Sequence, residues 1–403
     1  MAHAAIPPDE PLVRRVLQGA RERAAMPCGV AAAGAYTLWQ LGVEQKGFLH
    51  TFLVERVSGS GVPPLPLGYG NVLELKLIML WRQLCHDPDA LQGRQERVYD
   101  AVRSRLAALG VVKGPVTGIR EYEAGELAPG EFHSEHVRKA VPCVIRGFGP
   151  RDLGRLDFAG LARRFPDSKA QAVDTQTGTI ASVRLCDLEA DRGERYEPLQ
   201  ALLDQDPQLR EVFEPDNARR YFRVLGRPMP PIASFLILAI GKGLAAEFHC
   251  EESMNWYLAV SGSKRWTLVE SEYSWLMYPA ALGDGMRRFS LFKPSEDGTP
   301  RDRGCFDLFE YVPRVEFDLH PGDVLFFPAW MWHKTVNLDD EGLGVTSRYS
   351  LPGPMSNRYF RALQMISPDF LRSIVQVVAA KVRGDTGGLE EVGGFNEQEL
   401  ALR

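Results

Sequence analysis

The spacing of hydrophobic residues divides the chain into a helical first part and a β-rich second part. In residues 71–85 (NVLELKLIMLWRQLC) apolar positions recur every three to four residues, which predicts an amphipathic helix, and residues 95–109 repeat the pattern. Residues 58–70 are rich in Gly and Pro and are expected to form a loop. We therefore predict that residues 1–115 form a mainly helical N-terminal region.

From about Gly118 onward, short hydrophobic runs and glycine-containing turns replace the helical pattern. The β-branched and aromatic content of these runs predicts strands. The predicted strands are residues 141–147, 170–173, 179–185, 234–240, 254–261, 264–270, 315–319, 323–327 and 344–350. Residues 196–213 have the pattern of a helix instead. Short strands at this density are typical of a β-sandwich or barrel, so we expect one mainly β domain over residues 116–355.

The last part of the chain is predicted to be helical again. Residues 367–369 (SPD) form a good helix start, with Ser as the N-cap and Pro in the first turn. An apolar stripe follows, made of Phe370, Leu371, Ile374, Val377 and Val378. Residues 356–403 are therefore expected to form a C-terminal helical extension and a tail.

Composition and charge fit a globular protein and give no support to nucleic-acid binding. Hydrophobic residues make up 45% of the 403 residues, and the formal net charge is −5. No run of Lys and Arg has the density of a nucleic-acid-binding tail. The expected partner is therefore not a nucleic acid.

Cysteine spacing and the N-terminal sequence bear on location. The six cysteines are widely separated and form no CxxC pair, which favours free thiols in a reducing, intracellular and cytoplasmic setting. Residues 24–43 are uncharged and long enough for a membrane anchor or a signal segment. Their Ala, Gly and Pro content favours a buried helical segment, so a membrane role is the weaker alternative.

Candidate chemistry begins at His249-Cys250-Glu251. In a strand, residues i and i+2 point to the same face, so His249 and Glu251 project together and Cys250 points away. This is the local half of a 2-His-1-carboxylate site, which leaves coordination positions open for an oxygenase's substrates. Alone, the pattern also arises by chance among eight histidines and many glutamates.

His333 is a candidate for the second histidine of such a site. The turn at residues 320–323 (HPGD) leads into an apolar strand, and residues 328–333 (PAWMWH) end at His333. A histidine after a buried strand and two tryptophans lies in an apolar setting that is poor in water. A hydrogen-bonded core histidine is the alternative, but it leaves the HxE pair in the same β-rich segment unexplained.

Together, these motifs resemble a known family. The HxE pair, a lysine at position 264, the PGD turn, the following strand and the Pro-x-x-x-Trp-His end are similar to the JmjC/cupin-like Fe(II)- and 2-oxoglutarate-dependent oxygenases, particularly those of the hypoxia-inducible-factor asparaginyl hydroxylase type. The resemblance covers residues 120–350. It implies a double-stranded β-helix (jelly-roll) core, with Fe(II) as cofactor and 2-oxoglutarate and O2 as cosubstrates. It also implies oxidative decarboxylation of 2-oxoglutarate to succinate and CO2.

The resemblance assigns roles to single residues of this chain. The iron ligands would be His249, Glu251 and His333, although many relatives have Asp at the second position. Lys264, which shares strand parity with Trp266 and Leu268, would pair with the distal carboxylate of 2-oxoglutarate, helped by Tyr196. Asn255 would lie near the other end of the cosubstrate. An exposed strand lysine is the alternative for Lys264.

Two positions depart from the family pattern. Ala246 stands three residues before the first ligand, where relatives have a Thr or Ser that contacts 2-oxoglutarate. Arg348 stands in the last strand, about where some relatives have Asn. Because a last-strand arginine grips the distal carboxylate in other 2-oxoglutarate enzymes, Arg348 competes with Lys264 for that role, or it binds an acidic part of the substrate. The mouth of the site is expected near Arg348 and Trp332.

The expected activity is hydroxylation of a protein side chain or a small molecule. The alternatives are demethylation of N-methyl-lysine by the same chemistry and a non-enzymatic cupin-fold binding protein. Relatives dimerise through C-terminal helices, so a homodimer through the 370–378 stripe is possible. The competing interpretation is that this stripe packs back on its own chain.

Overall fold

The computed structural model describes two long N-terminal helices and most strands of the β-rich part. The described residues are 65–85, 90–149, 157–174, 180–188, 195–198, 220–224, 227–228, 231, 233–280, 287–290, 307–349, 359–360 and 363. The segment 24–43 and the stripe at residues 370–378 lie outside them. Within the described ranges, no helix is long and apolar enough to cross a membrane.

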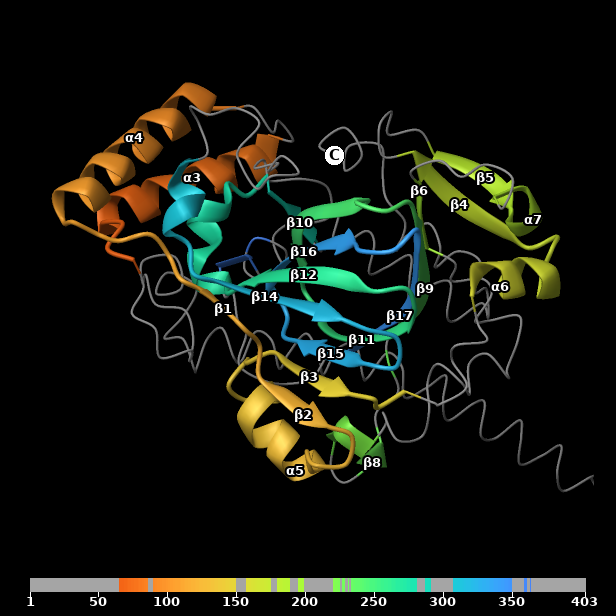
Figure 1. Cartoon of the computed structure of the whole chain (residues 1–403). Coiled ribbons are helices and arrows are strands. Elements are labelled where there is room, and N and C mark those ends of the chain that lie inside the picture. The colour runs from red at the N-terminus through yellow and green to blue at the C-terminus, as the bar shows by residue number, and fades with distance from the viewer. Residues whose placement is uncertain are drawn as a thin grey trace, which may run out of the picture.

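Two β-sheets form the centre of the molecule (Figure 1). The smaller sheet has six strands, in the order β1 (Val116–Thr117), β14 (Arg314–Leu319), β12 (Lys264–Val269), β16 (Trp332–Asn337), β10 (Ala245–Glu251) and β13 (Arg287–Phe289). Its pairings are antiparallel except for the short parallel pair β1 and β14.

The larger sheet has nine strands. Their order is β2 (Glu121–Glu123), β3 (Cys143–Arg146), β15 (Val324–Phe327), β11 (Met254–Ser261), β17 (Glu341–Tyr349), β9 (Ala233–Ile240), β6 (Arg195–Pro198), β4 (Lys169–Asp174) and β5 (Ile180–Arg184). A separate hairpin joins β7 (Arg223–Val224) and β8 (Arg227–Pro228). This arrangement confirms the predicted mainly β, jelly-roll core.

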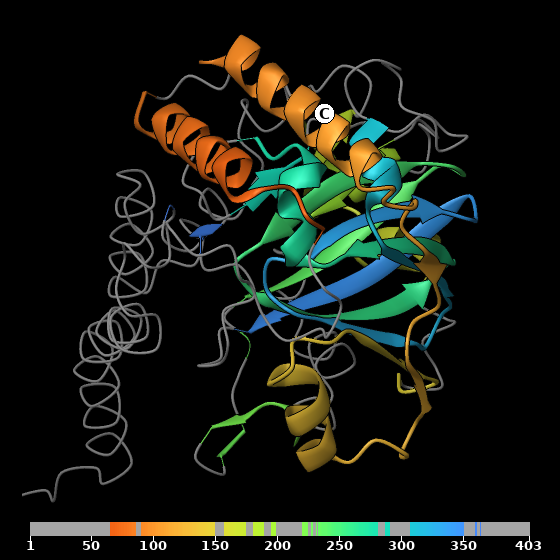
Figure 2. The same cartoon turned by 90° about the vertical axis from the view of Figure 1, so that its left-hand side faces the viewer.

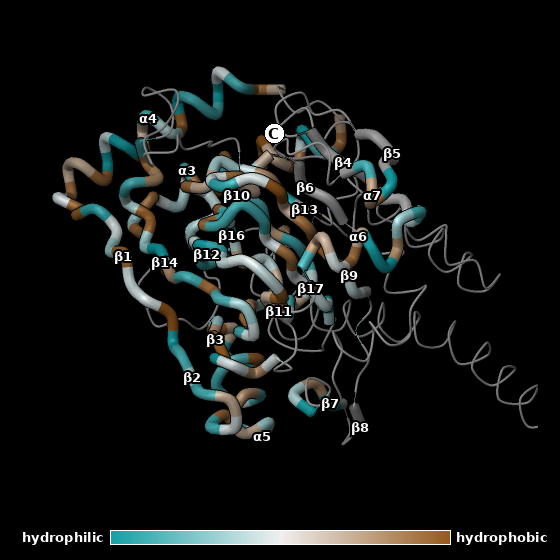
Figure 3. Tube along the Cα trace, turned by 45° about the vertical axis from the view of Figure 1, so that its right-hand side comes forward, coloured by the Kyte–Doolittle hydropathy of each residue, from teal (hydrophilic) through white to brown (hydrophobic). Residues whose placement is uncertain are grey.

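Helices lie outside the sheets. The long helices α3 (Tyr69–Cys85) and α4 (Gln92–Ala108) lie side by side at one side of the strands, and the hairpin of β4 and β5 lies at another (Figures 1 and 2). The short helices are α5 (Pro129–Glu131), η2 (Phe132–Val137), α6 (Phe158–Arg164), α7 (Leu185–Leu188), η4 (Ser271–Met277) and η5 (Asp307–Tyr311). Hydrophobic and hydrophilic residues alternate along α4 (Figure 3), as its buried Val98, Val102 and Leu106 require.

Successive side chains of a strand point to opposite faces of its sheet, and the buried apolar side chains therefore form three layers. In β11, Tyr257 and Ala259 point into the space between the sheets, where they join Trp266 and Phe327. The intervening residues of β11, Trp256 and Leu258 among them, pack on the outer face of the larger sheet. A third layer joins the outer face of the smaller sheet to α3 and α4. The space between the sheets is therefore lined by residues of a single parity on each strand.

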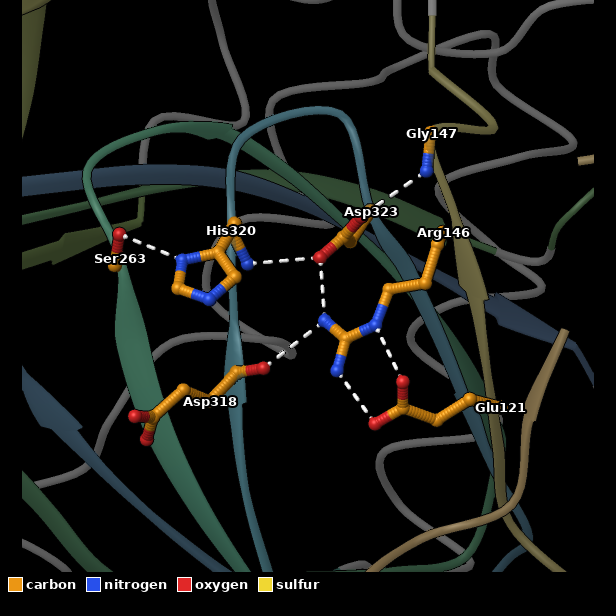
Figure 4. Close-up of polar contacts among 7 residues, drawn as sticks. All are labelled: Glu121, Arg146, Gly147, Ser263, Asp318, His320 and Asp323. Atoms are coloured by element: carbon orange, nitrogen blue, oxygen red, sulfur yellow. Dashed lines mark hydrogen bonds and ion pairs between the residues drawn. The ribbon is translucent and has the colours of Figure 1, made fainter. Parts of the chain in front are cut away.

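The turn between β14 and β15 is held by one buried carboxylate (Figure 4). Asp323 accepts hydrogen bonds from the backbone N–H groups of Gly147 and His320, both at 3.0 Å, and pairs with Arg146 at 2.6 Å. Gly322 in this turn has a φ of +90°, a conformation that glycine adopts without a steric penalty. The predicted PGD turn thus fixes where β15 enters the larger sheet.

The six strands predicted between residues 234 and 350 are confirmed: residues 254–261 agree at both ends, and the other bounds differ by at most three residues. The helix predicted for residues 196–213 is wrong at its start, because Tyr196 lies in β6 and pairs with β9. The backbone of β6 forms its hydrogen bonds with the edge of β9, a distant strand, so the sequence around Tyr196 alone does not reveal this pairing. Residues 199–213 lie outside the described part.

Candidate active site

His249 and His333 lie directly opposite each other on neighbouring strands. They are Cα partners in the antiparallel pair β10 and β16, and their ring centroids are 4.1 Å apart. The His333 ring also lies 4.6 Å from the ring of Phe327, which is in the apolar layer between the sheets. Two residues far apart in the sequence are therefore brought to one apolar location.

Both imidazoles are oriented by a backbone carbonyl. His249 Nδ1 lies 2.8 Å from the carbonyl oxygen of Glu247, and His333 Nδ1 lies 3.0 Å from that of Met331. A carbonyl only accepts, so in each ring Nδ1 donates and Nε2 carries the lone pair. Histidines that bind metals commonly have this second hydrogen bond, which fixes the ring and its tautomer. Both rings fit an Fe(II) site.

Glu251 behaves differently from the two histidines. It is buried, and its carboxylate forms an ion pair with the guanidinium of Arg348 on β17. In the described part of the chain, no three His, Cys, Asp or Glu side chains are grouped so that they could hold a metal ion. The donor types present match a 2-His-1-carboxylate set. For Glu251 to complete it, the carboxylate must be shared with Arg348 or released by it.

The strand parity predicted around the HxE pair agrees with the structure. Cys250 points away from the two histidines, into the apolar layer under α3 and α4, where burial raises the pKa of its thiol. Ala246 stands three residues before His249, so in a regular strand it would point to the opposite face from His249. An irregularity between these two residues shifts the register of β10 with β16 and turns Ala246 to the interior face. The Cα partner of Ala246 is Thr335, which is also the partner of the interior residue Trp266.

Lys264 is a buried cation at the other end of the smaller sheet. It lies on the interior face with Trp266 and Leu268, as its parity predicts, and is 5% exposed. Its side chain passes over Gly342, beside the amide of Asn337, and among the described residues it has no carboxylate partner. Burial lowers the pKa of the ammonium to about 8. A buried ammonium without a counter-charge is a suitable site for an anion.

A row of neighbouring residues on adjacent strands leads from Tyr196 to Lys264. The backbone of Tyr196 pairs with Ala239, and Ala239 pairs in turn with Gly342, against which the Lys264 side chain lies. Asn255 lies elsewhere, opposite both Phe327 and Arg348 in the larger sheet. Its amide donates to the Ser253 carbonyl and accepts from the Thr346 hydroxyl.

Trp330, one of the two tryptophans before His333, has a role near the site that the sequence did not predict. Its φ is +62°, a region that bulky residues rarely adopt. Its backbone N–H donates to the carbonyl of Glu251 at 2.7 Å, which links the segment before His333 to the end of β10. A tryptophan in this conformation must be held by its surroundings, and its indole packs 5.6 Å from the Phe360 ring.

The expectation that Trp332 lies at the mouth of the site is wrong. Trp332 is fully buried in the layer under α3 and α4, and its indole N–H donates to the Ser274 hydroxyl at 2.9 Å. It points away because it precedes His333 in β16 by one residue. Arg348 is the member of the pair that faces the site, through its contact with Glu251.

Comparisons with known proteins agree with the fold. Residues 189–350 match the family model described as a Cupin-like domain, a family that includes Fe(II)- and 2-oxoglutarate-dependent oxygenases. HSPB1-associated protein 1 of Mus musculus is 32% identical over 93 residues, which are 23% of this chain. That match spans only 19% of the relative's own length. The matched family region contains every candidate residue discussed above.

Proposed function

We propose that this chain is an Fe(II)- and 2-oxoglutarate-dependent oxygenase that hydroxylates a protein side chain or a small molecule. The observation that carries the proposal is the pair His249 and His333, whose Nδ1 atoms are both held by backbone carbonyls. Their rings lie 4.1 Å apart in an apolar layer, with a buried glutamate two residues along the same strand. This orientation leaves Nε2 of each ring as the atom that can bind a metal ion.

In this proposal, His249, Glu251 and His333 hold the iron. Fe(II), when bound there, supplies the redox chemistry by which O2 is consumed with 2-oxoglutarate and a substrate C–H bond is hydroxylated. The chain's own part is to orient three ligands and to leave coordination positions open. Trp266, Phe327 and Tyr257 surround the site with apolar surface that excludes water.

Lys264 is the residue that we assign to the distal carboxylate of 2-oxoglutarate. Support comes from its burial, its interior orientation and the lack of a carboxylate partner among the described residues. Arg348 is less suited to this role because it already pairs with Glu251. Tyr196 belongs to the row that leads to Lys264, which supports a role for it beside the same carboxylate.

One observation favours a non-enzymatic binding protein as the second candidate. The Glu251–Arg348 pair neutralises the glutamate without a metal, as a protein that had lost its iron would require. Ala246, which lacks the usual hydroxyl, also fits this alternative. The oxygenase requires the histidine pair to bind a divalent metal ion and the bound 2-oxoglutarate to be turned over, whereas a binding protein turns over no 2-oxoglutarate.

A cobalt titration tests the proposal. The purified full chain should bind one Co(II), and His249→Ala and His333→Ala should each abolish this binding because each removes one of three ligands. Cys250→Ala is the matched control: its side chain lies on the opposite face of the same strand, so cobalt binding should be unchanged. Full stoichiometric binding by either histidine variant would reject the assignment and leave the binding-protein alternative.

A further inference from the structure

Lys264 and the histidine pair are separated by one row of residues on the interior face of the smaller sheet. The strands β12, β16 and β10 are neighbours in this sheet (Figure 1). Their register gives an end row of Lys264 and Asn337, a middle row of Trp266, Thr335 and Ala246, and a histidine row of Leu268, His333 and His249. Successive rows are two residues apart, which is roughly 7 Å at the rise of a β-strand. A molecule that reaches from a metal ion at the histidines to Lys264 therefore passes over the middle row.

The middle row carries one hydroxyl group, that of Thr335. This residue has the same strand parity as His333 and Asn337, so its side chain belongs to the interior face, where it is partly exposed. Among the described residues its hydroxyl has no hydrogen-bond partner. Ala246, its Cα partner on β10, contributes only a methyl group. The hydroxyl that is missing at position 246 is therefore present one strand away.

A buried carboxylate beside Lys264 needs more donors than the ammonium alone. Its two oxygens accept several hydrogen bonds, and burying them without partners is costly. Asn337 lies opposite Lys264, but its amide nitrogen already donates to the carbonyl oxygens of Ala239 and Gly241, at 2.9 and 3.1 Å. Both amide hydrogens of Asn337 are therefore used, whereas the hydroxyl of Thr335 remains available.

We propose that Thr335 donates a hydrogen bond to the distal carboxylate of 2-oxoglutarate and shares this carboxylate with Lys264. It supplies from β16 the hydroxyl that Ala246 cannot supply from β10. The distal carboxylate is the end concerned, because the other carboxylate and the 2-oxo group would bind the metal and the methylene groups between them accept no hydrogen bond. This inference rests on the proposed function, since it takes 2-oxoglutarate as the ligand of Lys264.

The first test is calorimetric titration of 2-oxoglutarate into the Co(II)-loaded full chain. Thr335→Val keeps the β-branched shape and removes the hydroxyl, so it should weaken binding roughly tenfold or more, the scale of a hydrogen bond to a charged group. Thr335→Ser keeps the hydroxyl and should stay close to the wild type. Thr267→Val is the matched control: Thr267 lies between Trp266 and Leu268 on β12 and faces outward, so binding should be unchanged.

The second test moves the hydroxyl back to β10. In the Thr335→Val background, Ala246→Ser places a hydroxyl on the partner residue, so it should recover most of the lost affinity. A role of Thr335 in packing alone would not be restored in this way, and an unrecovered loss would overturn the inference. Thermal unfolding of each variant establishes that it is folded, and Thr335→Ala repeats the comparison if the Val variant is not.

The third test identifies the end of the ligand that Thr335 binds. The probe is 2-oxopentanoate, which has the 2-oxo acid group but no distal carboxylate. Its affinity, read from the visible spectrum of bound cobalt, should be the same in the wild type and in Thr335→Val. If the variant weakens 2-oxopentanoate as strongly as 2-oxoglutarate, Thr335 acts at the metal end or through packing, and the inference is wrong.

Failure of the inference can be separated from failure of the proposed function. If the wild type binds Co(II) and 2-oxoglutarate, and Thr335→Val binds both equally well, the role of Thr335 is rejected while the proposed function stands. If the wild type binds no Co(II), or binds Co(II) but no 2-oxoglutarate, the proposed function itself fails. The cobalt affinity of each variant is therefore measured before 2-oxoglutarate is added.

Discussion

The rings of His249 and His333 lie 4.1 Å apart, and each is held through Nδ1 by the carbonyl of the residue two positions before it. Neighbouring antiparallel strands place the two residues opposite each other, so the backbone alone brings them together. The identical hydrogen-bonding pattern then fixes both rings in the tautomer that suits a metal ligand. The chemistry of the site starts from this relationship.

Lys264→Met should stabilise the protein in the absence of ligand and abolish tight binding of 2-oxoglutarate. The substitution replaces a buried cation with an apolar side chain of similar length and removes the cost of burying the charge, about 3 kcal/mol for a pKa lowered from 10.5 to about 8. Thermal unfolding measures the first effect, and calorimetric titration of the Co(II)-loaded protein measures the second. Unchanged affinity for 2-oxoglutarate would reassign the anchor, with Arg348→Met as the next variant to examine.

The affinity for 2-oxoglutarate should fall as pH rises above about 8. Burial lowers the pKa of Lys264 to about 8, and only the protonated amine attracts a carboxylate. Its described neighbours include Asn337 and Gly342, neither of which titrates, and burial is the cause of the lowered pKa. A calorimetric series between pH 6.5 and pH 9.5, as a rough range around that value, should show the decrease in the wild type and not in Lys264→Arg, whose cation persists. A flat profile in the wild type would contradict the assignment.

The lowered pKa of Lys264 also predicts how the stability of the fold changes with pH. The folded-state pKa of Lys264 lies below its ordinary value of 10.5, so the unfolded chain binds more protons between about pH 8 and 10.5. The contribution of Lys264 therefore makes the protein more stable as pH rises through this window. The difference in unfolding temperature between the wild type and Lys264→Met should narrow from pH 7 to pH 10. A widening difference would mean that another group compensates the lysine.

Gly342→Ala should weaken 2-oxoglutarate binding without changing metal affinity. A methyl group at Gly342 would lie 2.6 Å from Cε of Lys264 and 2.9 Å from Oδ1 of Asn337, so the lysine must move. Losing well-aligned contact with a charged group costs about 1.5–3 kcal/mol, or roughly tenfold or more in affinity. Gly118→Ala is the control, since a methyl group there meets nothing within 4 Å. Equal affinities in both variants would show that the Lys264 position is not important for binding.

Asp323→Ala should strongly destabilise the fold. The carboxylate accepts from two backbone N–H groups and pairs with Arg146, which keeps a second ion pair with Glu121. The loss of Asp323 therefore acts mainly through the two backbone N–H groups, each of which costs about 1–3 kcal/mol when it is buried without an acceptor. Asp318→Ala is the matched control, because its pair with Arg265 is exposed and contributes about 0–1 kcal/mol. Similar unfolding temperatures for the two variants would show that Asp323 does not hold the turn.

Much of the central fold could be predicted because its strands have a clear period of two. Residues 254–261 are bounded by turns, and their interior and exterior sides could be assigned before the structure was known. The same parity placed Lys264 on the interior face and Cys250 off the face of the candidate metal ligands. These inferences needed only local geometry.

The features that could not be predicted depend on contacts between distant strands. The pair of Glu251 with Arg348 follows from the way β17 and β10 face each other, which no local pattern encodes. The register shift that turns Ala246 inward and the positive φ of Trp330 are backbone irregularities set by packing. Tyr196 was assigned to a helix because the edge of β9 that it pairs with lies about forty residues later in the chain.

Formation of succinate from 2-oxoglutarate tests the central claim most directly. The full chain with Fe(II) in air should convert 2-oxoglutarate to succinate, and fractions of cell lysate that contain the substrate should increase the yield. His333→Ala should remove both the basal and the stimulated conversion, since it removes a ligand while the rest of the fold remains. If the wild type binds metal and 2-oxoglutarate, yet forms no more succinate than His333→Ala with any peptide, amino acid or lysate fraction, the chain is a binding protein and not an oxygenase.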